Sequence, residues 1–158
     1  MFRELVRKNK QLTQEECIRL LTDLPRGVLS VPGDEGYPYG VPLDHWYNPE
    51  DGRIYFHSGN TGHKVDAITR CDKASFCVMD PGYLAEGDWA LTIRSVIVFG
   101  KIQIVEDPER AIDITRKLSY KYTSDTAFIE GEIRNYSGDL LVFALIPEHI
   151  TGKIVKES

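Results

Sequence analysis

Apolar residues at helical spacing predict an amphipathic helix near the start of the chain, over residues 13–24. Thr13 and Glu16 have the spacing of a capping box, and the apolar side chains after them recur at the i, i+3, i+4 and i+7 positions of one helix face. Pro25 ends this helix, because proline cannot continue it. The same type of pattern predicts two further helices, over residues 60–70 and 107–122.

Between the helices, apolar and polar residues alternate with the period of two that is typical of β-strands. Pro38 and Pro42 cannot donate to a strand ladder, so their strand lies at a sheet edge or is broken by a bulge, and Gly100 predicts a bulge or a barrel corner. The predicted strands cover residues 27–31, 37–47, 53–58, 74–79, 90–105 and 140–146.

Six strands with helices at the start, in the middle and near the end predict a mainly β (α+β) fold. We expect a closed antiparallel six-stranded barrel with flanking helices. No linker, repeat or low-complexity tract interrupts the pattern, so residues 1–158 are expected to form one domain. A hydrophobic fraction of 42% with 27% charged residues is typical of a globular protein and argues against disorder.

The net charge of −5 argues against a nucleic acid or an anionic membrane as a partner, since either needs clustered Lys and Arg. The three cysteines have no paired metal-ligand spacing, so no metal site is expected. Cys17 and Cys77 are interpreted as small buried hydrophobes. The odd thiol count, without a signal peptide or a long apolar run, predicts a reducing cytoplasm.

The chemically informative segment is residues 54–68, where a strand ends, a glycine-containing loop follows and a helix begins. A helix start presents unpaired backbone N–H groups and the positive end of the helix dipole. Gly59 and Gly62 allow close backbone approach, Ser58 and Thr61 add hydroxyl donors, and Lys64 adds a charge. This combination predicts a phosphate site. The P-loop and dinucleotide fingerprints are both absent, and the alternative is a loop that binds nothing beside a solvated lysine.

Three stretches together resemble the pyridoxamine 5′-phosphate oxidase-like split barrels, and within them the nitroimidazole-resistance proteins. They are GYPYGVPLDHWY at 36–47, YFHSGNTGHKVDAI at 55–68 and RSVIVFGKIQIVED at 94–107. The likeness runs in order over residues 14–105 and more loosely through the last strand and residues 150–153. It implies a six-stranded split β-barrel that forms a homodimer with two FMN sites along the subunit interface.

The resemblance also assigns candidate residues. Those expected to grip the FMN phosphate are Ser58, His63 and Lys64. Those expected to border the isoalloxazine ring are Val41, Pro42 and Leu43, and those expected at the ribityl chain and ring edge are Arg94, Ser95 and Val96. Family members often carry an arginine where this chain has His63 and Lys64, which leaves open how the two share the phosphate. His57 matches the histidine that nitroimidazole-resistance proteins place beside the flavin, and it is therefore the catalytic candidate.

We therefore expect an FMN-dependent oxidoreductase that is nitroreductase-like and acts on nitroimidazoles or similar acceptors. NAD(P)H would bind only transiently over the flavin, because no dinucleotide motif is present. His57 would deliver the protons that nitro reduction consumes. The alternatives are a non-catalytic flavin carrier, a haem protein that uses His57 as iron ligand, and a purely structural His57. His45 and His149 are interpreted as structural or exposed, and Asp44 and Trp46 either line the substrate side or pack at an interface.

Overall fold

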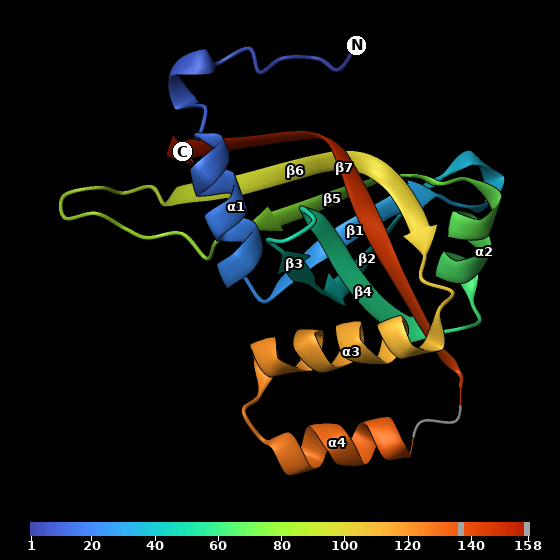
Figure 1. Cartoon of the computed structure of the whole chain (residues 1–158). Helices are drawn as coiled ribbons and strands as arrows, with labels where there is room; N and C mark the ends of the chain where they lie inside the picture. Colours follow the sequence, from blue (N-terminus) through green and yellow to red (C-terminus); the bar gives the residue numbers. More distant parts are fainter. Residues whose placement is uncertain (136–137, 157–158) are drawn as a thin grey trace.

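The structure is a computed structural model that describes residues 1–135 and 138–156. Within these residues seven strands form one antiparallel sheet, which curls around its own inner face (Figure 1). The order of the strands across the sheet is β2-β1-β5-β6-β7-β4-β3. Their bounds are Arg26–Pro32 (β1), Pro38–Asp44 (β2), Trp46–Asn48 (β3), Arg53–Gly59 (β4), Lys73–Met79 (β5), Thr92–Ile104 (β6) and Leu140–Lys156 (β7).

The mainly β (α+β) class is confirmed, with seven strands rather than the six expected. The expected closed barrel is wrong for the described residues, because the curled sheet keeps two edges, at β2 and β3. The additional strand arises because the predicted strand 37–47 breaks at His45, which separates β2 from β3. Side chains of a distant helix take the backbone groups of His45: its N–H donates to the Tyr122 hydroxyl at 2.9 Å, and Lys121 donates to its carbonyl oxygen at 2.9 Å. A residue whose backbone groups are bound in this way cannot continue a strand ladder.

Two other expectations about the sheet are confirmed. Strand β2, which contains both prolines, lies at one edge of the sheet, where missing N–H donors are tolerated. The register between β6 and β7 shifts between Phe99 and Gly100, as expected for a bulge. A Cβ atom at Gly100 would lie only 2.2 Å from the carbonyl oxygen of Ile146, so the close approach of β7 requires glycine here.

Four α-helices accompany the sheet in the described residues: α1 Gln14–Asp23, α2 His63–Arg70, α3 Pro108–Tyr122 and α4 Thr126–Arg134. Short 3₁₀ turns span Lys8–Lys10 and Asp34–Gly36. Helix α1 begins with the expected capping box at Thr13 and Glu16, and Asp107 caps α3. Helix α4 was not predicted. It packs beside α3, and both lie along one side of the curled sheet (Figure 1).

The main core fills the inner face of the sheet and is closed by α1. It consists of large apolar side chains, among them Leu21, Leu29, Ile54, Phe56, Phe76, Val96 and Phe143. Cys17 is fully buried, as expected, while Cys77 is only partly buried on β5. A smaller cluster on the outer face of β4 and β7 packs against α3 through Tyr55, Ile114, Val142 and Ala144. Helix α3 thus covers the outer side of β4, the strand that carries His57.

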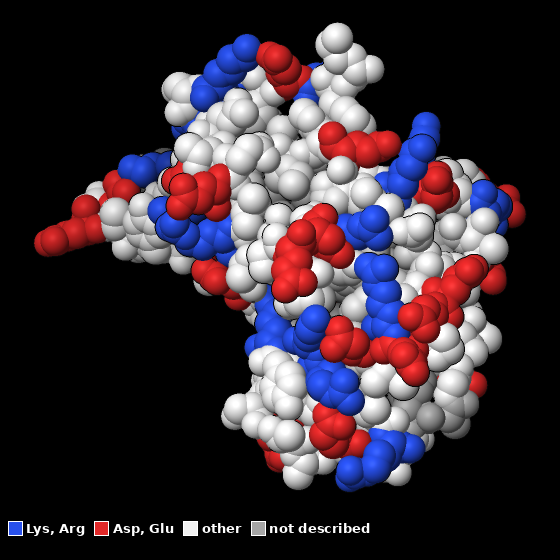
Figure 2. Space-filling model, viewed as in Figure 1, with Lys and Arg blue, Asp and Glu red and all other residues white. Residues whose placement is uncertain are grey.

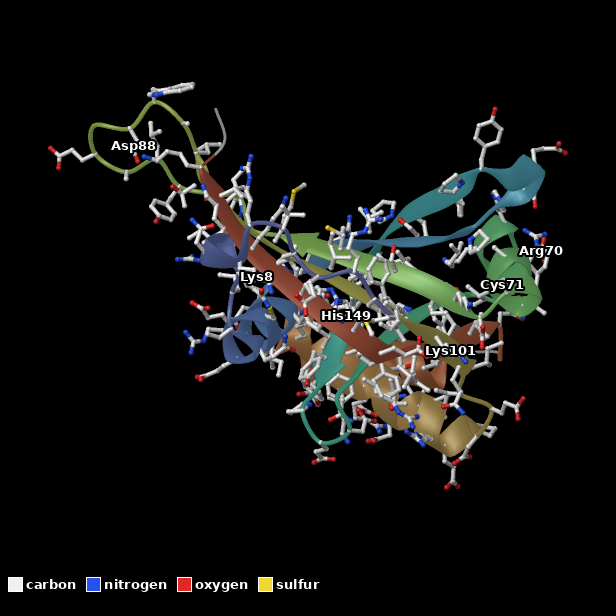
Figure 3. The ribbon with its side chains drawn as sticks, turned by 90° about the horizontal axis from the view of Figure 1, so that it is seen from above. Lys8, Arg70, Cys71, Asp88, Lys101 and His149 are labelled. Atoms are coloured by element: carbon white, nitrogen blue, oxygen red, sulfur yellow. The ribbon has the colours of Figure 1, made fainter. Side chains whose placement is uncertain are left out.

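Seen from above, the loop between β5 and β6, which includes Asp88, projects from one end of the sheet (Figure 3). Helix α2, with Arg70 at its last residue, lies at the opposite end (Figure 3). On the face drawn in Figure 2, acidic and basic side chains are interspersed without a continuous basic patch. Within residues 1–135 and 138–156, no helix is both long and apolar enough to cross a membrane.

Candidate functional site

The loop between β4 and α2 is open and lies against an uncapped helix start. Gly62 occupies the N-cap position with φ +115°, a conformation that favours glycine, and no side chain caps the helix. A Cβ atom at Gly59 or Gly62 would have no neighbour within 4 Å. The first backbone N–H groups of an α-helix have no intrahelical partner. An anion in this loop would satisfy them and would be stabilised by the helix dipole.

Lys64 is the cation of this loop. It lies in the first turn of α2 and is partly buried, and burial lowers its pKa. In the part of the chain that the structure describes, its ammonium group has no ion pair or hydrogen bond with another residue. A partly desolvated lysine without a carboxylate partner is costly unless an anion binds beside it. The donors and the charge present therefore fit a phosphate group.

The other two predicted phosphate residues differ in orientation. The Ser58 hydroxyl donates to the carbonyl oxygen of Gly59 at 2.8 Å, beside the loop. His63 instead faces the turn between β1 and β2: its Nε2 accepts from the backbone N–H of Asp34 at 3.3 Å, and its ring stacks on Tyr39 with centroids 4.0 Å apart. The backbone of His63 belongs to the uncapped helix start, while its side chain is engaged elsewhere.

His57 lies on the outer face of β4, one residue before Ser58, and pairs in register with Val142. Its side chain is exposed; the protein atoms around it displace part of its hydration and lower its pKa, Lys64 adds to this effect, and Asp44 opposes it. The three residues are therefore within electrostatic reach of one another. The imidazole of His57 is mainly neutral at pH 7 and can both donate and accept a hydrogen bond.

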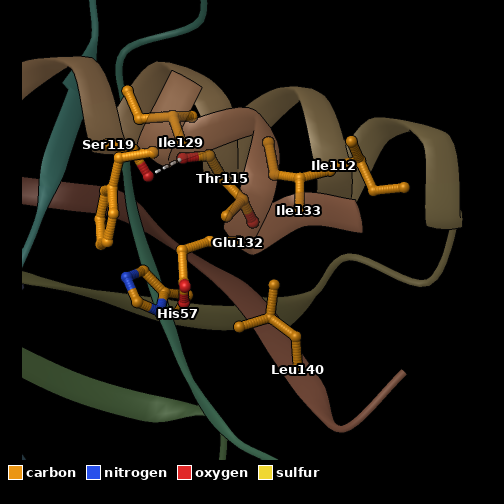
Figure 4. A pocket seen from close by; sticks show the side chains of 9 residues that line it. His57, Ile112, Thr115, Ser119, Ile129, Glu132, Ile133 and Leu140 are labelled. Atoms are coloured by element: carbon orange, nitrogen blue, oxygen red, sulfur yellow. Dashed lines mark hydrogen bonds between the residues drawn. The ribbon is translucent and has the colours of Figure 1, made fainter. Parts of the chain in front are cut away.

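Beside His57 is a cavity of about 240 Å³ that is lined by residues of α3, α4, β4 and β7 and is partly open to solvent (Figure 4). Its lining is mostly apolar and consists of His57, Ile112, Thr115, Ser119, Phe128, Ile129, Glu132, Ile133 and Leu140. The two hydroxyls are engaged with their own helix: Thr115 donates to the Ala111 carbonyl at 2.8 Å and Ser119 to the Thr115 carbonyl at 2.8 Å. Among the polar side chains of the lining, His57 and the exposed Glu132 are therefore the two that can bind a ligand in the cavity.

The predicted ring-bordering residues lie on the edge strand β2, directly before Asp44. Val41 and Leu43 pack partly against the core, whereas Pro42 faces outward and is exposed. Asp44 pairs with Arg26 at 2.8 Å and influences the pKa of His57. The structure therefore brings the 41–43 segment, His57 and the loop at Ser58 to Lys64 into one region.

Arg94, Ser95 and Val96 form a second group on β6. The register pairs Ser95 with Met79 on β5. Strand β6 is three strand spacings from β2, so Ser95 lies roughly 14 Å from Asp44 at about 4.8 Å per spacing. Val96 is fully buried in the core, and Arg94 lies 3.8 Å from the Asp80 carboxylate. The chain does not gather these residues around the loop of Lys64.

Sequence reasoning missed the α4 wall of the cavity, which contributes Phe128, Ile129, Glu132 and Ile133. Of the two interpretations of His45, structural or exposed, the structure supports the first: it is fully buried, its Nε2 lies 2.7 Å from the Leu21 carbonyl, and its Nδ1 has no partner in the part of the chain that the structure describes. Burial, together with the charge of Lys121, lowers the pKa of His45 to about 4. This histidine joins α1 to the break between β2 and β3 and is structural.

Among the described residues, no group of three or more His, Cys, Asp or Glu side chains is arranged to hold a metal ion. The sequence matches the pyridoxamine 5′-phosphate oxidase family over residues 13–154. No functionally curated protein matches the chain.

Several solved structures share the fold. A candidate 5-nitroimidazole antibiotic resistance protein from Bacteroides thetaiotaomicron has a TM-score of 0.78 and 20% identity, covering 91% of this chain and 86% of that one. An FAD-binding protein from Mesorhizobium loti has a TM-score of 0.64 and 21% identity, with 93% and 98% covered. The flavocytochrome Anf3 from Azotobacter vinelandii has a TM-score of 0.65 and 18% identity, with 92% and 68% covered.

These likenesses support the split-barrel interpretation of the curled antiparallel sheet, and the family match extends over nearly the whole chain. By this match, the chain belongs to the pyridoxamine 5′-phosphate oxidase family.

Proposed function

We propose that the protein is an FMN-dependent oxidoreductase that reduces nitroimidazoles or similar nitroaromatic acceptors. The observation that carries the proposal is the unpaired Lys64 at an open, uncapped helix start, within electrostatic reach of His57. The family, the FAD-binding relative and the candidate nitroimidazole-resistance relative support a flavin and this acceptor class.

The phosphate of FMN would be held by the first backbone N–H groups of α2, by the Ser58 hydroxyl and by the Lys64 ammonium. His63 would contribute its backbone N–H, because its ring is held by Asp34 and Tyr39. A single phosphate site favours FMN over FAD. From this loop the ring system would extend past His57 toward the Val41, Pro42 and Leu43 segment, where Pro42 presents an outward, exposed surface.

Bound FMN supplies the redox chemistry: it passes electrons from a reduced nicotinamide to the acceptor. Two-electron reduction of a nitro group to a nitroso group consumes two protons and releases water. His57 is the side chain placed to deliver a proton to a nitro oxygen, since it borders both the loop and the cavity. The apolar cavity wall would exclude water from the acceptor.

A homodimer is part of the proposal, because the outer face of β1, β5 and β6 carries exposed apolar side chains. Val28, Ile97, Phe99 and Met79 are 42%, 39%, 40% and 67% exposed, and the strand register places them close together on β1, β5 and β6. An apolar patch of this kind marks an interaction surface. Ser95 and Pro42 belong to the same face, so a second copy seated there would also enclose the proposed flavin.

Anaerobic turnover tests the proposal and separates it from a non-catalytic flavin carrier. The purified protein, supplied with FMN and NADPH or NADH, is expected to consume a 5-nitroimidazole with loss of the nitro absorbance. A protein that holds FMN but never oxidises the nicotinamide in the presence of the acceptor would be a carrier. A protein that binds haem through His57 and no flavin would contradict the proposal.

A further inference from the structure

The cavity beside His57 has a composition that selects among acceptors. Its walls are built from the side chains of Ile112 on α3, of Phe128, Ile129 and Ile133 on α4, and of Leu140 at the start of β7 (Figure 4). The hydroxyls of Thr115 and Ser119 are already bonded within α3. A ligand inside would therefore meet apolar carbon on most sides and one imidazole at His57.

The size of the cavity limits the ligand to a small one. Sites for drug-sized molecules occupy about 300–1,000 Å³, and this cavity encloses about 240 Å³. A single aromatic or heteroaromatic ring with a short substituent matches that volume. The ring would lie against the isoleucines, with its polar substituent toward His57.

The charged side chain in the lining of the cavity is negative: it is Glu132, which is exposed. On the side of the strands, His57 is under the opposing influence of Asp44 and Lys64. The neighbouring cations of α3 are neutralised: Arg116 binds Glu130 at 2.6 Å, and Lys117 binds Asp113 at 3.0 Å. An anionic ligand would lose hydration on entering and would meet the like charge of Glu132, while Lys64, the cation that acts on His57, is assigned to the flavin phosphate in the proposed function.

We propose that this cavity is the acceptor site and that it admits neutral or cationic single-ring acceptors while rejecting carboxylates and phosphate esters. Ile112, Phe128 and Ile133 set the ring specificity, and Glu132 sets the charge specificity. The inference rests on the proposed function for the identity of the ligand as an acceptor, while the selectivity of the cavity stands on its lining alone.

Binding of a matched pair of probes tests the inference. Nitrobenzene and 4-nitrobenzoate share a ring and a nitro group and differ by one carboxylate. In ligand-observed NMR titrations of the protein, with and without added FMN, nitrobenzene is expected to bind at least tenfold more tightly than 4-nitrobenzoate. Equal affinity of the two probes would overturn the charge selectivity.

Two substitutions assign the effect to the cavity. Glu132→Lys is expected to narrow the difference between the probes at least fivefold, whereas Glu86→Lys makes the same charge change on the projecting loop and is expected to leave the ratio within twofold. Ile133→Trp is expected to weaken nitrobenzene binding at least tenfold by filling the cavity, with the circular dichroism spectrum and thermal unfolding checking that the fold is retained. A folded Ile133→Trp protein with unchanged nitrobenzene affinity would place the probe elsewhere.

The two proposals can fail separately. Selective probe binding to a protein that takes up no FMN, or does not turn over, would leave the cavity inference standing and would overturn the proposed function. Turnover with bound FMN and no discrimination between the probes would support the proposed function and would overturn the cavity inference.

Discussion

The rings of His63 and Tyr39 stack with their centroids 4.0 Å apart and an interplanar angle of 27°. This contact turns the side chain of His63 toward the β1–β2 turn, where Asp34 also binds it. The two adjacent basic residues of the sequence thus have different surroundings. Lys64 remains the cation available to the loop between β4 and α2.

Lys64→Ala is expected to weaken FMN binding by about 10- to 100-fold, because a charge-assisted contact to phosphate is worth about 1.5–3 kcal/mol. His63→Ala is the matched control and is expected to change the affinity less than about threefold. Fluorescence titration of the apoprotein with FMN measures both values. An affinity of Lys64→Ala within threefold of the original would show that the phosphate binds elsewhere.

His57→Ala is expected to retain FMN and the oligomeric state but to lose at least about tenfold in anaerobic nitroimidazole turnover, since general-acid assistance is typically worth about 10²–10⁴ in rate. Because the pKa of His57 is lowered from 6.5, the part of the turnover that depends on its imidazolium form should rise only below pH 6.5. Steady-state kinetics across pH 5–8 would reveal this rise and its loss in the variant. Normal turnover by His57→Ala would make the histidine structural.

Ile97→Arg is expected to convert the proposed dimer to a monomer and to reduce FMN retention, because it places a charge in the middle of the exposed apolar side chains of β1, β5 and β6. The buried interface should be obligate-sized, roughly 2,000 Å² or more. Tyr37→Arg alters another exposed apolar residue, before β2, and should leave the dimer intact. Light scattering at micromolar concentration measures the mass. A monomeric original protein with FMN bound would refute the dimer.

The buried His45 predicts a pH dependence of stability. Its pKa is about 4 in the folded protein and near 6.5 when unfolded, so between these values the unfolded chain binds a proton that the folded protein does not. The free energy of unfolding should therefore fall as the pH drops from 6.5 toward 4, by up to about 3 kcal/mol. Urea unfolding at pH 7 and pH 5 measures the change. His45→Gln, which keeps a donor for the Leu21 carbonyl, should reduce it, and an identical pH dependence in this variant would show that another group is responsible.

Local signals predicted most of the sheet. The capping box at Thr13, the edge position of the proline-containing strand and the bulge at Gly100 each depend on residues close in sequence. The break at His45 could not be predicted in this way, because the groups that bind its backbone come from Lys121 and Tyr122, more than seventy residues later.

In the candidate site too, the parts built from contiguous residues could be predicted, and the parts built from residues distant in sequence could not. The loop at Ser58 to Lys64 was recognisable because its glycines, hydroxyls and lysine are contiguous. The cavity beside it was not, because its far wall is α4, where Gly131 lies mid-helix and lowers helix propensity. The orientation of His63 depends on Asp34 and Tyr39, which belong to another hairpin.

FMN held at the loop of Lys64 would give the purified protein a flavin chromophore. The protein is therefore expected to be yellow, with the two flavin absorption bands, and to release FMN rather than FAD when denatured, as identified by chromatography. A Soret band, released FAD, or a colourless protein that fails to bind added FMN would contradict this expectation.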